Sequence, residues 1–150
     1  MAVTSHRCAW QAFIAAGIVS IAPALWGLAE LAPDSVSADA QPDYLVHPLA
    51  LSTAARVALT VGAGVLVITA VFVFTRAVRR HEIDRRWAGV IIPLSAVTAA
   101  TGLIYSAITA PVIGANIGGG LAIMAGVPFA VAMLVLAAVR SLRLWRHRPE

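Results

Sequence analysis

The stretch from residue 51 to residue 75, LSTAARVALTVGAGVLVITAVFVFT, decides the class of this chain. It has one charge, Arg56, near its beginning, and the residues that follow are apolar or small on every side of a helix. A helix on the surface of a soluble protein would instead show one polar face. About 20 apolar residues suffice to cross the roughly 30 Å hydrocarbon core of a bilayer. The stretch therefore predicts a helix that spans a membrane.

Three further runs of the same kind lie at residues 8–32, 87–112 and 117–139. With 60% hydrophobic residues and a mean hydropathy of +0.86 over 150 residues, the chain has room for one membrane domain and little outside it. We expect an all-α integral membrane protein, in which residues 1–150 form a single bundle of four transmembrane helices.

The longest segment outside these runs is a loop at residues 33–50. Three prolines keep it from forming a continuous helix, and they are Pro33, Pro42 and Pro48. Near its end, Tyr44, Leu45, Val46 and Leu49 could fold back onto the membrane surface, form a short lid over the helix ends, or stay solvated. The sequence favours none of these three alternatives.

Arginines are distributed unevenly about the four runs. The sequence has 11 basic residues, all of them arginine, and every one except Arg56 falls on the same side if the helices alternate in direction. Because basic residues are enriched on the cytoplasmic side of a membrane, we expect both termini in the cytoplasm. Trp26 would then lie near the outer headgroups. Arginine without lysine resembles a bacterial high-GC coding bias, so the predicted location is the bacterial cytoplasmic (inner) membrane.

Several of these arginines are candidates for contacts with anionic lipid headgroups or with an acidic protein partner. They follow the second and fourth runs, and they are Arg79, Arg80, Arg85, Arg86, Arg140, Arg143 and Arg146. A net charge of +4 in a soluble protein would suggest nucleic acid, but membrane insertion explains basic residues that flank apolar runs. We therefore expect a bilayer with anionic headgroups as partner, and no nucleic acid.

Small residues recur at every fourth position along the last two runs. In lipid, such spacing lets helix backbones approach closely, which holds helices together. The link at residues 111–116 is so short that these two runs are expected to form an antiparallel hairpin. The predicted packing positions are Gly102, Ser106, Ala110, Gly114, Gly118, Ala122 and Gly126.

Two opposite charges lie at the edge of the predicted membrane. Glu30 is near the end of the first run and Arg56 near the start of the second, so both are expected at similar depth. They are a candidate ion pair that would fix the packing of two helices. Ionisable groups at membrane depth are also candidates for coupling to a transported proton or substrate.

The sequence contains no motif for catalysis, a cofactor or a metal. Cys8 is the only cysteine, which excludes an internal disulfide and a thiolate cluster. His81, Glu82 and Asp84 lack the spacing of a zinc motif and lie among arginines that would repel a cation. No histidine falls inside a run, where a membrane haem would need one.

These observations predict a protein that is not an enzyme. The expected function is a non-catalytic accessory, assembly or stabilising subunit of a larger bacterial membrane complex, with a protein partner in the membrane or a second copy of the chain. The alternative is a small oligomeric transporter or efflux component that uses Glu30 and Arg56.

Overall fold

The computed structural model describes the backbone of residues 2–30, 45–110 and 115–146. Four helices account for most of it, and the described residues contain no strand. The elements are α1 (Ala2–Glu30), α2 (Thr53–Arg79), the short 3₁₀ helix η1 (Arg85–Trp87), α3 (Ala88–Thr109) and α4 (Ala115–Arg146). All four α-helices are long and apolar enough to cross a membrane, which is the pattern of a multi-pass membrane protein.

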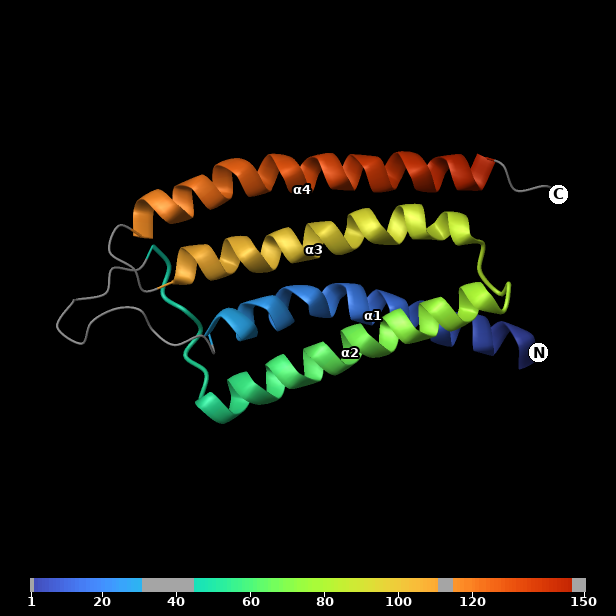
Figure 1. Ribbon diagram of the computed structural model, residues 1–150, viewed down its shortest axis with the longest axis horizontal. Coiled ribbons are helices and arrows are strands. Elements are labelled where there is room, and N and C mark those ends of the chain that lie inside the picture. The colour runs from blue at the N-terminus through green and yellow to red at the C-terminus, as the bar shows by residue number, and fades with distance from the viewer. Residues whose placement is uncertain (1, 31–44, 111–114, 147–150) are drawn as a thin grey trace.

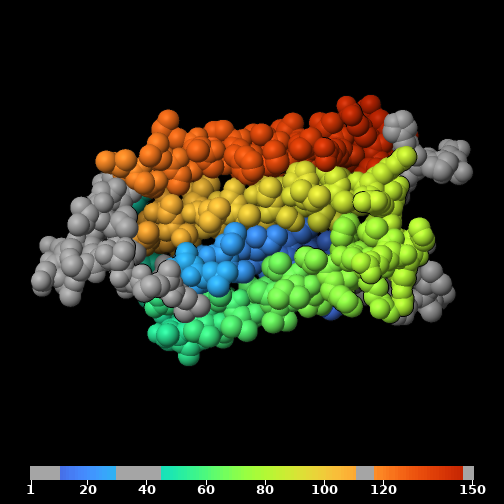
Figure 2. All heavy atoms as spheres, in the orientation of Figure 1, coloured from blue at the N-terminus to red at the C-terminus, as the bar shows by residue number. Residues whose placement is uncertain are grey.

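The helices lie in a row in the order α2, α1, α3, α4 (Figure 1). The central helices α1 and α3 pack against each other, α2 packs against α1, and α4 packs against α3. Figure 2 shows α4 along one edge of the visible face and α2 along the other. The central α1 span is the most buried of the four, at 33%, and the edge α4 span is the least buried, at 6%, while the α2 and α3 spans are both 17% buried. The four-helix assembly is therefore an open row with two edge helices.

Adjacent helices in the sequence alternate in direction. The start of α1, the link between α2 and α3, and the end of α4 lie together at one end of the row (Figure 1). We call this the arginine end, because it carries the arginines between Arg76 and Arg86 and those between Arg140 and Arg146. We call the opposite end, where α2 and α4 begin, the distal end.

Three helices extend beyond the apolar runs seen in the sequence. α1 begins at Ala2, α2 continues from residue 75 to Arg79, and α4 continues from residue 139 to Arg146. Hydropathy locates the apolar part of a helix, whereas backbone hydrogen bonds continue through charged residues. Arginine has a high helix propensity, so Arg76 and Arg140 lie within these helices without interrupting them.

Glycines of α1 set its distance from α2. A Cβ atom built on Gly17 would collide with Ala70, and one built on Gly27 would collide with the side chain of Thr60. Both partners belong to the buried face of α2, whose members are Thr60, Ala63, Ala70 and Ala77. Because packing between backbones is the main attraction between helices in lipid, these contacts hold α2 on the row.

The two other helix contacts also depend on glycine. A Cβ atom on Gly102 would lie 2.7 Å from the carbonyl oxygen of Ala22, so α3 approaches the backbone of α1 there. A Cβ atom on Gly126 would lie 2.5 Å from the Cδ1 atom of Ile104, at the contact between α4 and α3. Gly102 therefore serves the centre of the row, and Gly126 serves an edge.

The segment after residue 44 joins the distal ends of the helices. The Val46 N–H donates to the carbonyl oxygen of Ile108 at 3.0 Å, and the Leu45 side chain lies over Gly119 at the start of α4. Of the three alternatives for this part of the loop, contact with the helix ends is the one observed for Leu45 and Val46. Leu49 is exposed, and Tyr44 lies outside the described residues.

Candidate functional site

The link between α2 and α3 is built around His81, which has a positive φ of 57°. Its N–H donates to the Val78 carbonyl at 3.1 Å, and the Glu82 N–H donates to the Ala77 carbonyl at 3.0 Å. This pair of bonds is a Schellman motif, in which a left-handed residue ends a helix. Ile83 then turns inward and is buried against Ala77. Within this link, His81 has a structural role that the sequence analysis did not identify.

The carboxylates of the link lie beside neighbouring arginines. An Asp84 Oδ1 atom accepts from the Arg86 N–H at 2.9 Å and caps η1, and its Oδ2 atom lies 3.9 Å from the Arg86 Nε atom. Glu82 lies 4.0 Å from Arg80. All of these side chains are at least half exposed, so each pair contributes at most about 1 kcal/mol to stability. Their main effect is to orient the link.

No group of three His, Cys, Asp or Glu side chains with the geometry of a metal site occurs among the described residues. Several hydroxyl groups within the helices donate to carbonyl oxygens one turn earlier. Examples are Ser20 to Ala16 at 2.7 Å and Thr109 to Tyr105 at 2.8 Å. These bonds satisfy the hydroxyls inside an apolar environment.

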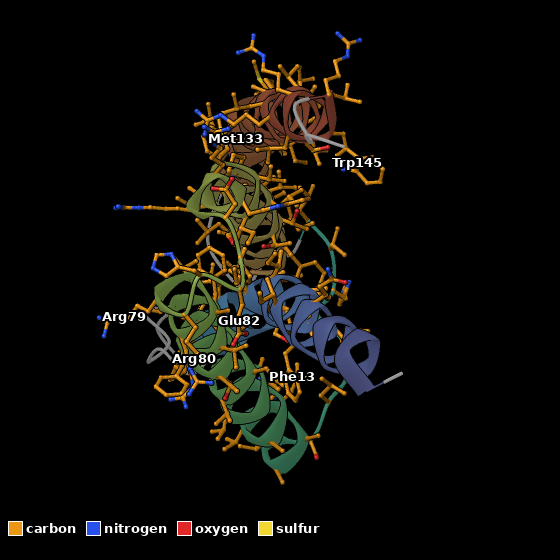
Figure 3. The ribbon with its side chains drawn as sticks, turned by 90° about the vertical axis from the view of Figure 1, so that its right-hand side faces the viewer. Phe13, Arg79, Arg80, Glu82, Met133 and Trp145 are labelled. Atoms are coloured by element: carbon orange, nitrogen blue, oxygen red, sulfur yellow. The ribbon has the colours of Figure 1, made fainter. Side chains whose placement is uncertain are left out.

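The arginines at the arginine end differ in what they contact. The Arg140 Nη1 atom donates to the Gly89 carbonyl at 3.1 Å and ties the end of α4 to the start of α3. Arg143 and Arg146 are exposed on the last turns of α4. Figure 3 shows Arg79 and Arg80 on the side of α2 away from α1, with Glu82 towards the middle of the row. Only some of these arginines therefore bond to other residues of the protein.

Arg56 lies in the first turn of α2 at the distal end. Its N–H donates to the Ser52 carbonyl at 3.0 Å, and its Nη2 atom lies 3.5 Å from the Leu51 carbonyl oxygen. Ser52 caps the helix, because its hydroxyl oxygen accepts from the Ala55 N–H at 3.2 Å. Glu30 is the last residue of α1, and its side chain lies outside the described residues, so its pairing with Arg56 stays a prediction.

The predicted small-residue positions do not all face the same neighbour. Gly126 and Ala122 lie on the side of α4 that faces α3, whereas Gly102 faces α1 and Gly118 faces open space. Gly114 lies outside the described residues. The remaining two positions are half-buried at the distal end of α3, and they are Ser106 and Ala110.

A groove of about 510 Å³ runs between α3 and α4. Its walls are entirely apolar, and most of its residues are small; these include Ala96, Ala99, Ala100, Ala122, Ala125 and Gly126. Leu103, Ile104 and Phe129 complete the walls. A groove of this composition admits the close approach of another helix.

Trp26 is buried rather than exposed to headgroups, contrary to the prediction of an interfacial anchor. It is 5% exposed, and its ring meets the ring of Tyr105 edge-on, with centroids 5.6 Å apart. Its Nε1 atom has no hydrogen-bond partner among the described residues. Tryptophan prefers headgroups only when its edge reaches them, and here the contact of α1 with α3 encloses it.

No family model, curated protein or solved structure matches the chain.

Proposed function

We propose that the chain is a non-catalytic subunit of a larger bacterial membrane complex, with an accessory, assembly or stabilising role. In this proposal it lies in the cytoplasmic (inner) membrane with the arginine end, and thus both termini, in the cytoplasm. The gathering of arginines at one end of the row supports this orientation, since basic residues are enriched on the cytoplasmic side.

The observation that carries the proposal is the groove between α3 and α4 at the edge of the open row. The hydrophobic effect does not drive helices together within lipid, so helix association there depends on close packing. Small side chains on both walls, such as Ala99 and Ala125, allow that packing for a helix from another protein. A partner helix would give α4 a second neighbour.

The arrangement of polar groups agrees with a non-catalytic role. Asp84 caps η1, Arg140 joins two helices, and the hydroxyls of Ser20 and Thr109 bond to their own helices. Each of these groups has a structural partner and none is set beside a base that would activate it.

The experiment is purification of the tagged full chain from its native membrane in a mild detergent, followed by sizing and mass spectrometry of the proteins that accompany it. A stoichiometric companion of different sequence is the expected result. A homogeneous oligomer of this chain, without companions, would contradict the accessory role and favour a self-sufficient transporter.

A pair of variants connects the companion to the groove. Ala125→Phe fills the groove and is expected to release the companion. Ala138→Phe makes the same change on the opposite side of α4, where 3.6 residues per turn place it, and is expected to retain the companion. Retention by both variants would move the partner surface elsewhere.

A further inference from the structure

A second hollow, of about 600 Å³, lies along α2 near the arginine end. Residues of one helix face line it: Ile68, Val71, Phe72, Thr75, Arg76, Arg79 and Arg80. They follow each other at intervals of three or four, so they form a single stripe, which we call the α2 stripe. This stripe is opposite the face with Ala70 and Ala77 that packs on α1. It therefore faces outward from the edge of the row.

The stripe has an apolar half and a basic half. Ile68, Val71 and Phe72 are each at least 60% exposed, which leaves a continuous apolar strip along the helix. One turn further on, Arg76 and Arg79 place two guanidinium groups on the same side. At the boundary between the two halves, the Thr75 hydroxyl donates to the Val71 carbonyl oxygen at 2.7 Å. The hydroxyl proton is therefore already bonded within α2.

Arg76 and Arg79 are available for a ligand, unlike Arg86 and Arg140. Neither Arg76 nor Arg79 has a side-chain hydrogen bond or ion pair within the described part of the chain. Arg86 lies beside Asp84, and Arg140 is bonded to a backbone carbonyl. Arg80 lies 4.0 Å from Glu82 and contributes less.

We propose that the α2 stripe binds an anionic phospholipid, with the phosphate on Arg76 and Arg79 and an acyl chain along Ile68, Val71 and Phe72. Guanidinium groups bind phosphate oxygens in a bidentate manner, and the stripe presents two of them where the apolar surface ends. A phospholipid has the same order of chemistry along its length, a charged phosphate followed by hydrocarbon. An acidic soluble segment would match the arginines and leave the apolar half uncovered.

The test uses the full chain in mild detergent, mixed with phosphatidylglycerol or phosphatidylcholine and examined by native mass spectrometry. The wild type is expected to retain one phosphatidylglycerol in preference to phosphatidylcholine. The double variant Arg76→Gln/Arg79→Gln is expected to lose this preference by at least about tenfold, since two charge-assisted hydrogen-bonding groups are removed.

The matched control is Arg143→Gln/Arg146→Gln, which removes the same charge from exposed arginines on α4 that also lack a side-chain partner within the described residues but do not line the hollow. It is expected to retain phosphatidylglycerol like the wild type. Equal loss in both double variants would show attraction to overall charge and would overturn the proposal. Wild-type protein without a preference for phosphatidylglycerol would overturn it as well.

Two further measurements distinguish lipid binding from a loss of folding and from binding of a phosphate group alone. Arg76→Lys/Arg79→Lys preserves the charge and is expected to keep part of the preference; its complete loss with unchanged thermal unfolding would contradict a phosphate site. Glycerol phosphate has the headgroup chemistry without acyl chains and is expected to be retained at least about tenfold less than the lipid. Equal retention of glycerol phosphate and lipid would show that Ile68, Val71 and Phe72 do not bind an acyl chain.

Discussion

In the central helix α1 and the edge helix α4, the relation between hydropathy and burial is the reverse of that in a soluble protein. In a soluble protein, the most apolar helix is the most buried. Here α4 has a higher mean hydropathy than α1, yet the α1 span is 33% buried and the α4 span only 6%. In a bilayer, surface exposed to lipid must be apolar, whereas a helix enclosed by protein can carry small and polar residues. High hydropathy therefore marks the edges of this row.

A larger side chain at the centre of the row is the most direct test of the difference between the central and the edge helices. Gly102→Val would put a branched side chain against the backbone of Ala22, where no flexible group can move away. We expect a loss of about 3 kcal/mol in the free energy of unfolding, at the upper end of typical overpacking effects. Reversible unfolding of the purified protein in detergent measures it.

The matched change at the edge is Gly118→Val, because a Cβ atom there meets nothing within 4 Å. This variant is expected to change the free energy of unfolding by less than about 0.5 kcal/mol, as exposed substitutions usually do. If the two variants unfolded alike, the central and edge glycines would be equivalent and the row order would have no energetic meaning.

A smaller effect is expected at the segment that joins the distal ends of the helices. Val46→Pro removes the N–H that donates to the Ile108 carbonyl and should lower the free energy of unfolding by about 1 kcal/mol. Hydrogen exchange of amides at the distal end should increase. Val46→Ala keeps the N–H and removes an exposed side chain, so it should behave like the wild type.

A small effect is also expected at His81, whose left-handed backbone conformation ends α2 at the arginine end. His81→Gly relieves the steric cost of a positive φ but gives the unfolded chain more freedom. We expect a gain of at most about 1 kcal/mol in the free energy of unfolding. His81→Val should instead lower it, because a β-branched residue resists this conformation. A loss of stability with glycine would assign His81 a contact beyond the helix end.

The length of the apolar runs and the distribution of charge in the sequence were enough to predict four apolar helices that alternate in direction. The order of the helices in the row was not predictable, because hydropathy says how apolar a helix is and not which neighbour it meets. Gly102 illustrates this limit. It shares its fourfold spacing with Ser106 and Ala110, yet its close contact is with α1.

The candidate sites were predictable to a smaller extent. The arginines were found from their clustering, but only geometry separates Arg140, which bonds to Gly89, from Arg76 and Arg79 on the α2 stripe. Gly17 and Gly27 were missed because they are ten residues apart and belong to no ladder. The left-handed conformation of His81 has no signature in the residue type.

The place of α1 in the row has a consequence for how the protein is made. α1 precedes the other three helices in the chain, so it is synthesised before them and can pair with α2 as soon as that helix follows. Its second face, which contains Ala22 and Trp26, has no neighbour until α3 is synthesised. Of the four helices, α1 thus waits longest for its last neighbour, and Trp26 has no contact with Tyr105 until α3 follows.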